Sequence, residues 1–154
     1  SLVRLVRRVL DEAGLPARLL EPELTESLLL ENVESVISTF QQLRSLGIPL
    51  AIDDFGTGYS SLSYLKRFPV HYVKIDQTFI RDISTNSEDA AITRAIIAMA
   101  HGLELKVVAE GVETQAQMDF LKAQRCDELQ GYLISPPLPA SAFAQLLREQ
   151  VPEY

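Results

Sequence analysis

The sequence has few of the residues that mark secreted, membrane or DNA-binding proteins. Its 154 residues include one cysteine, Cys126, so no intrachain disulfide can form, and a reducing, cytoplasmic setting fits. No apolar run approaches the ~20 residues that a membrane helix needs. Acidic residues outnumber basic ones by 21 to 14, whereas DNA binding requires a basic surface. We therefore expect a cytoplasmic domain without DNA or membrane contact, although a small phosphorylated ligand is compatible with bound metal ions.

Histidine is also scarce, which limits the chemistry open to the chain. His71 and His101 are the only histidines, too few and too far apart in sequence for a histidine metal cluster. Ser60 and Ser61 lack a suitable histidine partner, so a serine hydrolase is a poor interpretation. His101 falls near the end of a predicted helix, where a capping role is expected.

Helix and strand patterns alternate along the whole chain. Gly14 and Gly47 supply helix stops, and Thr85 with Glu88 and Thr114 with Gln117 have the spacing of capping boxes. Apolar residues at helical spacing predict helices over residues 2–10, 33–46, 60–67, 87–103, 114–121 and 140–148. Shorter apolar runs predict strands over residues 19–24, 49–53, 70–75, 106–109 and 129–133.

Repeated strand–helix units predict an α/β protein with a parallel sheet covered by helices. An open doubly wound sheet and a TIM-like (β/α) barrel both satisfy this pattern. Nearly every predicted strand ends in polar residues, which favours the barrel, because a barrel site is assembled from the carboxyl ends of many strands. A closed barrel typically takes about 250 residues. We therefore expect an incomplete barrel of about five βα units.

The segment from Asp53 to Ser61 carries the most information about chemistry. Asp53 and Asp54 directly follow an apolar strand, where two like charges repel each other unless a cation neutralises them. Carboxylates at a strand end suit hard cations such as Mg²⁺ or Mn²⁺. Gly56 and Gly58 allow the following loop to turn sharply near a ligand. An acidic turn with capping residues is the structural alternative.

Other polar residues occupy equivalent strand ends. Glu23 and Glu110 end two strands, Glu26 and Gln130 lie nearby, and Lys74 lies inside an apolar strand. A buried lysine is costly unless it is paired, and each residue taken singly is also compatible with a solvated turn or a structural ion pair. Together they place carboxylates, a lysine and a glutamine on one rim, as in a metal-dependent hydrolase.

Five segments together resemble the EAL-type cyclic di-GMP phosphodiesterase family. They are Glu-Leu-Thr-Glu at 23–26, Asp-Asp-Phe-Gly-Thr-Gly-Tyr-Ser-Ser-Leu at 53–62, Lys-Ile-Asp at 74–76, Glu-Gly-Val-Glu-Thr at 110–114 and Gln-Gly-Tyr-Leu at 130–133. The resemblance implies a (β/α)₈-type barrel that hydrolyses cyclic di-GMP to linear pGpG with Mg²⁺ or Mn²⁺. It also implies a homodimer of the complete domain and is compatible with upstream cyclase-like or sensory domains.

The resemblance assigns roles to individual residues. Glu23, Asp53, Asp54 and Glu110 would bind metal, with Asp53 bridging two ions. Lys74 would orient or help to deprotonate the attacking water, and Gln130 would support the metal-bound water or Glu110. Glu26 would hold the loop from Asp54 to Leu62, and Asp76 and Glu113 would lie behind the ligands or face the substrate.

Two departures from the family pattern bear on activity. The Glu-Ala-Leu tripeptide and an upstream Asn-x-Ser segment, which supply two metal ligands in the family, do not occur in this sequence. We therefore expect residues 1–154 to be the C-terminal portion of the domain; the alternative is a non-catalytic module that binds cyclic di-GMP or a protein partner. Pro22 stands where the family has an apolar residue, and proline is unfavourable in a central strand.

Overall fold

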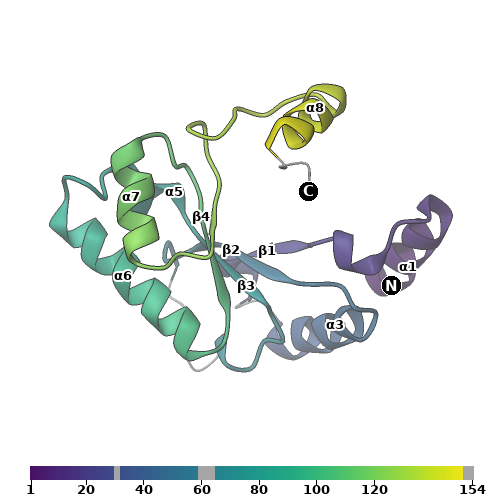
Figure 1. Ribbon diagram of the computed structural model, residues 1–154. Helices are drawn as coiled ribbons and strands as arrows, with labels where there is room; N and C mark the ends of the chain where they lie inside the picture. The colour runs from purple at the N-terminus through teal and green to yellow at the C-terminus, as the bar shows by residue number, and fades with distance from the viewer. Residues whose placement is uncertain (30–31, 59–64, 151–154) are drawn as a thin grey trace.

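A parallel sheet of five strands forms the centre of the protein. The computed structural model describes residues 1–29, 32–58 and 65–150. Within them, each strand pairs with the next in chain order (Figure 1). The strands are β1 (Glu23–Thr25), β2 (Ala51–Phe55), β3 (Tyr72–Ile75), β4 (Lys106–Ala109) and β5 (Glu128–Leu129). The sheet is not closed, so the predicted α/β fold with an incomplete barrel of five βα units is confirmed.

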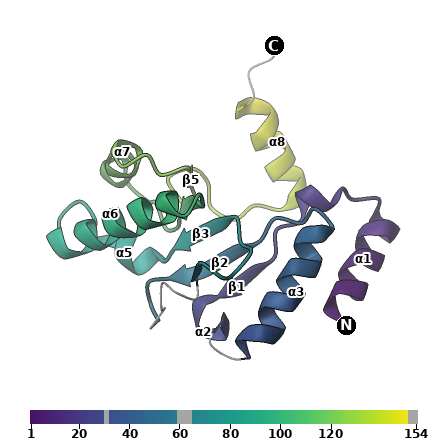
Figure 2. The ribbon, with the colours of Figure 1, turned by 90° about the horizontal axis from the view of Figure 1, so that it is seen from below.

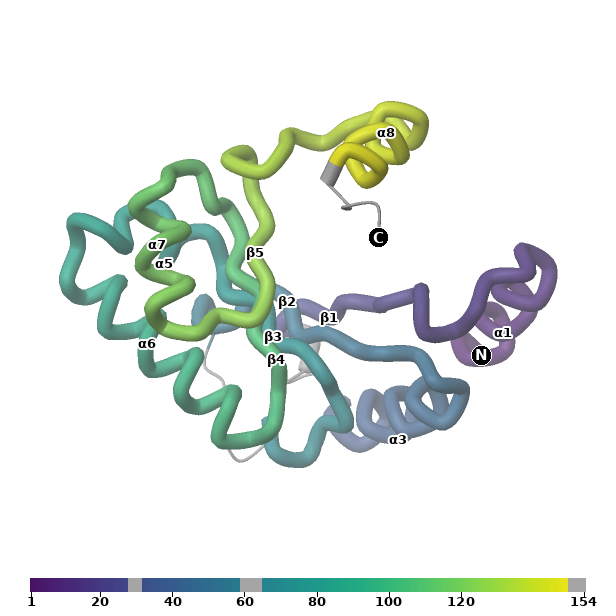
Figure 3. Tube along the Cα trace, in the orientation of Figure 1, coloured from purple at the N-terminus to yellow at the C-terminus, as the bar shows by residue number. Residues whose placement is uncertain are grey.

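Helices lie along the outside of this sheet. Figure 2 shows α3 beside α1 at one end, and α6 and α7 at the other. The backbone trace in Figure 3 shows the chain leaving the sheet after β5 and ending in α8, apart from the other helices. The helices are α1 (Leu2–Ala13), η1 (Ala17–Leu19), α2 (Glu26–Leu29), α3 (Val33–Ser45), α5 (Gln77–Arg81), α6 (Ser87–Gly102), α7 (Gln115–Ala123) and α8 (Ala140–Gln150). No helix in the described ranges is long and apolar enough to cross a membrane.

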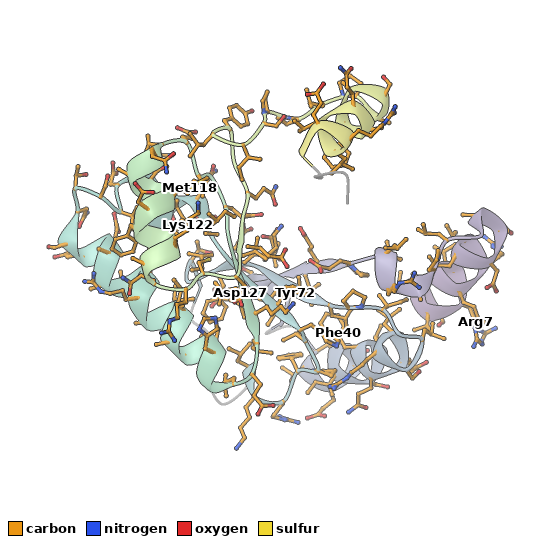
Figure 4. The ribbon with its side chains drawn as sticks, viewed as in Figure 1. Arg7, Phe40, Tyr72, Met118, Lys122 and Asp127 are labelled. Atoms are coloured by element: carbon orange, nitrogen blue, oxygen red, sulfur yellow. The ribbon has the colours of Figure 1, made fainter. Side chains whose placement is uncertain are left out.

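The hydrophobic core lies between the middle strands and the helices that cover them. Ile52, Val73 and Val107 are completely buried on β2, β3 and β4. Phe40 of α3, labelled in Figure 4, packs edge-on against Phe68 with ring centroids 6.3 Å apart. This cover buries Ile52, Val73 and Val107, which are register partners on adjacent strands. It also fixes the carboxyl ends of the strands, where the polar residues lie.

Several strand boundaries differ from the predicted ones. The first strand begins at Glu23, not at residue 19, because the chain before it forms the short helix η1. Pro22 therefore precedes β1, and its carbonyl oxygen accepts a hydrogen bond from the Ala51 amide at 3.1 Å. The last strand contains only Glu128 and Leu129, whereas residues 129–133 were expected.

Helix ends show one prediction confirmed and one wrong. Thr114 and Gln117 form the expected capping box of α7. Helix α6 is capped by Asn86, whose side chain accepts from the Glu88 and Asp89 amides, so the predicted Thr85–Glu88 box is wrong. The short α5 was not anticipated, since only five residues carry it. Most of the helix predicted at residues 60–67 lies outside the described residues.

Candidate metal and active site

Lys74 lies at the centre of a group of carboxylates at one end of the sheet. Its Nζ atom is 2.6 Å from Glu23 Oε1, 2.6 Å from Glu110 Oε1 and 3.8 Å from Asp53 Oδ1. The four side chains come from β1, β2, β3 and the residue after β4. Lys74 is 5% exposed, whereas the carboxylates remain partly open to solvent. The barrel-like curvature therefore brings together residues that lie up to 87 positions apart in sequence (Glu110 − Glu23).

These contacts keep Lys74 charged. Burial alone disfavours an ammonium group, but the hydrogen bonds to Glu110 and Glu23 and the charge of Asp53 outweigh it. The pKa of Lys74 is consequently raised above its ordinary value. At neutral pH the side chain is a hydrogen-bond donor and a fixed positive charge, so in this arrangement it is not a proton acceptor.

Asp53, Asp54 and Glu110 offer oxygen atoms that all lie within 4.8 Å of one another. Burial raises the pKa of Glu110, although the contact with Lys74 opposes the rise. Burial and the negative charge of Asp53 raise the pKa of Asp54. Both carboxyl groups therefore hold their protons more strongly than they would in water. Three convergent carboxylates are the donor set that Mg²⁺ and Mn²⁺ prefer, so the residues present fit a divalent cation.

The backbone at Asp54 adopts an uncommon conformation that helps to form this trio. Its φ angle is +54°, a left-handed geometry that aspartate tolerates better than most residues. The Asp54 amide donates to Asp53 Oδ1 at 2.9 Å. The pairing between β2 and β3 shifts register between Ile52 and Phe55. Such an irregularity re-aims side chains at a strand end, and here it lets two successive aspartates serve one site.

Glu26 holds the loop that follows the two aspartates. Its Oε2 atom accepts from the Gly56 amide at 2.8 Å and from the Gly58 amide at 3.3 Å. A side chain at Gly58 would lie 3.1 Å from the Glu26 carboxyl group, so glycine permits this close approach. Glu26 is 1% exposed, and its Oε1 atom has no hydrogen-bond partner among the described residues. The loop is thus tied directly to the end of β1.

Among the remaining predicted site residues, Asp76 acts on Asp54 through its side chain and charge, whereas Gln130 and Glu113 lie near this rim without joining the cluster. Gln130 is exposed, and its backbone bonds to Ala109 and Val112. Asp76 caps α5 by accepting from the Thr78 amide at 2.8 Å, and its charge also raises the pKa of Asp54. Glu113 is exposed, and its amide donates to Gln117 Oε1 at 2.7 Å. No contact in the described structure links the Gln130 or Glu113 side chain to Lys74.

Two acidic residues near the cluster were missed by the sequence reasoning. Burial and the charges of Glu128 and Glu23 raise the pKa of Glu21. Glu21 precedes Glu23 by two residues, the spacing that puts side chains on one face of an extended chain. Glu128 precedes Gln130 by the same spacing. This alternation could have identified both residues as facing the same side as the predicted ligands.

His101 has a different role from the expected helix cap. Its Nε2 atom lies 2.8 Å from Asp127 Oδ2, and the same oxygen accepts from the Val107 amide at 2.8 Å. Asp127, labelled in Figure 4, therefore connects α6, β4 and the start of β5. The pair is structural and lies outside the carboxylate cluster.

The comparisons with known proteins decide the family. The EAL domain family matches residues 1–137. The chain belongs to the EAL domain family. It is 53% identical over 148 residues to the cyclic di-GMP phosphodiesterase NbdA of Pseudomonas aeruginosa, covering 96% of this chain and 19% of NbdA. The resemblance that the five segments indicated is confirmed.

Two solved EAL structures give the same fold. The PaMucR phosphodiesterase in complex with c-di-GMP superposes with a TM-score of 0.89 and 46% identity, covering 92% of this chain and 57% of that one. Klebsiella pneumoniae BlrP1, in a complex with manganese and cyclic di-GMP, gives a TM-score of 0.82 and 36% identity over 88% of this chain and 34% of that one. The EAL chain thus spans about a fifth of NbdA and little more than half of the PaMucR chain.

Proposed function

We propose that this EAL domain hydrolyses one phosphodiester bond of cyclic di-GMP and releases linear pGpG. The observation that carries the proposal is the charged Lys74 held between Glu23 and Glu110, next to the oxygen trio of Asp53, Asp54 and Glu110. The relative NbdA is named for this activity, and the PaMucR and BlrP1 structures contain the cyclic dinucleotide.

We assign the metal-binding role to Glu23, Asp53, Asp54 and Glu110, and the metal to Mg²⁺ or Mn²⁺. When bound, such ions supply Lewis acidity that activates water and stabilises negative charge on phosphoryl oxygens. Asp53, Asp54 and Glu110 already converge, and the side chains of Glu23, Asp53 and Glu110 are partly exposed, which leaves them open to a cation. The BlrP1 complex contains manganese together with cyclic di-GMP, which supports the choice of metal.

Lys74 provides the fixed positive charge of the site. Its ammonium group can donate to water or to a phosphoryl oxygen, and it favours the negative charge that develops during hydrolysis. Because Glu23 and Glu110 hold its ammonium group at 2.6 Å each, we assign it orientation of the attacking water and charge stabilisation. Its packing within β3 keeps the donor in place, so little reorganisation is needed when substrate binds.

Glu26, Asp76, Glu113 and Gln130 complete the proposed site around the reacting groups. Glu26 positions the loop after Asp54 through the Gly56 and Gly58 amides. Asp76 fixes the start of α5, and its charge acts on Asp54. Gln130 and Glu113 are exposed on the rim, where they can contact substrate or support Glu110. Residues 138–150, which follow the matched segment, are assigned to the same domain.

We also propose that the complete domain forms a homodimer through α6 and the neighbouring loop that contains Gly56 and Gly58. An apolar hollow of about 430 Å³ lies between them, with Ile92 41% exposed at its edge. Phe55, Met99 and Glu26 also line it, so the same contact would reach the residue that holds the Asp54 loop. A cytoplasmic location and upstream domains stay predictions from the sequence.

The decisive experiment measures cyclic di-GMP hydrolysis by the full-length protein with Mn²⁺, with chromatographic detection of pGpG. We expect product from the unmodified protein and none above background from the Asp53→Asn variant. An Asp11→Asn variant, changed at an exposed position on α1, is the matched control and should keep activity. If the unmodified protein binds cyclic di-GMP but releases no pGpG, the proposal is wrong and a non-catalytic binding module replaces it.

A further inference from the structure

A second hollow lies at the opposite end of the sheet, where the strands begin. Its volume is about 440 Å³, within the range of sites that bind small molecules. Its wall comes from the end of α3, the segment before β3 and the turn between α6 and β4. The residues are Arg44, Pro49, Leu65, Lys66, Phe68, Pro69, Val70, His71, Tyr72, Leu103, Glu104, Leu105 and Lys106.

The charge of this hollow is opposite to that of the whole chain. Arg44, Lys66 and Lys106 supply three cations and Glu104 supplies the single carboxylate, whereas the net charge of the chain is −7. None of the three cations forms an ion pair within the described residues. Like charges gathered in one place repel each other, and a bound anion relieves that repulsion.

Hydrogen bonds join the starts of three strands beside the hollow. The His71 amide donates to the Leu50 carbonyl at 2.8 Å, and the Lys106 amide donates to the His71 carbonyl at 2.9 Å. The Leu50 amide donates to the Nδ1 atom of His71 at 3.2 Å. In the neutral ring the proton is then on Nε2. Burial, with a contribution from the Arg44 charge, lowers the pKa of His71 and favours that neutral form.

An aromatic wall lies beside these cations. Lys106 Nζ is 5.9 Å from the centre of the Tyr72 ring, and Phe68 and Pro69 continue the apolar surface. Figure 4 places Tyr72 on β3, within the sheet. An apolar wall with a few convergent charged groups is typical of sites for small organic anions, whereas a purely electrostatic surface patch has no such wall.

We propose that this hollow binds a small phosphate-bearing molecule, with Arg44, Lys66 and Lys106 around the phosphate and Tyr72 and Phe68 beside its organic part. Arginine and lysine are the usual phosphate partners in proteins. The site lies at the amino ends of the strands and the carboxylate cluster at their carboxyl ends, so the two are separate. The proposal does not depend on the hydrolytic activity proposed above.

The test measures binding of pyrophosphate and of GMP to the full-length protein by isothermal titration calorimetry, with EDTA present to remove divalent cations. We expect saturable binding of both, and tighter binding of GMP because its base can lie against the aromatic wall. Binding of pyrophosphate alone would keep the phosphate site but overturn the role of the wall. No saturable binding of either probe overturns the proposal.

Variants that remove cations and a variant that removes a carboxylate distinguish binding in this hollow from non-specific attraction of anions to the protein. Arg44→Gln combined with Lys106→Gln should weaken binding about tenfold or more, because each removes a charged partner. Glu104→Gln should strengthen binding, a gain that misfolding cannot produce. Lys122→Gln on α7, apart from Tyr72 in Figure 4, is the matched control and should leave binding unchanged. Equal weakening by Lys122→Gln, or no gain from Glu104→Gln, contradicts the proposal.

Discussion

Lys74 shows how one residue can be both a structural and a functional requirement. A lysine that is 5% exposed would destabilise the fold if it stood alone, since desolvation opposes its charge. The carboxylates of Glu23 and Glu110, each 2.6 Å away, remove that penalty. Conversely, the lysine reduces the repulsion among the acidic residues. Lys74 and these two carboxylates therefore depend on one another.

A Lys74→Met substitution tests this mutual dependence. In EDTA we expect it to lower the free energy of unfolding by about 3–5 kcal/mol, the cost of leaving partly buried charges unpaired. Hydrolysis should fall by about 100-fold or more, because a fixed donor to the developing charge is lost. Urea denaturation and pGpG formation measure the two effects. A variant as stable as the unmodified protein would show that the ion pairs do not hold the cluster together.

Cys126 gives a prediction about pH at the level of a single residue. Burial raises the pKa of its thiol to about 11, and the Sγ atom lies 3.4 Å from the Glu128 carbonyl and 3.5 Å from that of Val107. The folded state then retains the proton more strongly than the unfolded state. Its contribution to stability is complete below the unfolded pKa of about 9 and is lost as the pH rises towards 11.

We therefore expect the unmodified protein to lose about 2–3 kcal/mol more stability between pH 9 and 11 than a Cys126→Ser variant. The serine hydroxyl does not ionise in this range, so the difference between the two proteins isolates the thiol. Urea denaturation at several pH values measures it. Parallel curves would show that the thiol ionises as easily in the folded state as in the unfolded one.

At the level of elements, local patterns predicted helices better than strand ends. The capping box of Thr114 and Gln117 was predictable because both hydrogen bonds are made within four residues. Gln117 also donates to the Arg81 carbonyl at 2.9 Å, a contact with α5 that no local pattern contains. The β5 strand is shorter than its apolar run because only Glu128 and Leu129 pair with β4. Pairing partners decide strand ends, and the sequence does not display them.

The cap of α6 provides the test at this scale. Asn86 accepts from two amides of the first turn, whereas Thr85 donates its hydroxyl to the Asp82 carbonyl at 3.3 Å. Asn86→Ala should therefore cost about 1 kcal/mol of stability, the typical value for a lost cap. Thr85→Ala is the matched neighbour and should cost less than half as much. Thermal unfolding measures the loss of stability in both variants. A larger loss in Thr85→Ala than in Asn86→Ala would show that Thr85 is the cap, as the sequence predicted.

At the scale of the whole molecule, the open sheet leaves two apolar faces on its unpaired sides. Leu2, Leu5 and Val9 are each about half exposed on α1, and Phe143 and Leu147 are similarly exposed on α8. Figure 1 shows both helices next to the gap where the sheet is open. The solved relatives contain more chain than the segment that matches this one, and additional strands with their helices would cover such faces.

The sequence predicted the residues of the site better than the ends of the strands, and the reason lies in the architecture of the whole sheet. In a parallel α/β fold every strand ends on the same side, so residues at strand ends converge whatever the lengths of the intervening helices. That reasoning placed Glu23, Asp53, Lys74 and Glu110 on one rim. It could not give the +54° φ angle of Asp54, which accompanies the register shift within β2, or the exposed position of Gln130, which depends on packing after β5 ends.

The excess of negative charge at this rim predicts that divalent cations stabilise the whole domain. Asp53, Asp54 and Glu110 converge within 4.8 Å, and only Lys74 offsets them among the described residues. A ligand that binds only the folded state adds about 2.7 kcal/mol of stability at a hundred times its dissociation constant.

Mn²⁺ should therefore raise the unfolding temperature of the unmodified protein and of the Asp11→Asn control. Asp53→Asn should raise it in EDTA by relieving repulsion and should abolish most of the Mn²⁺ response. An unchanged Mn²⁺ response in Asp53→Asn would place the cation elsewhere on the protein.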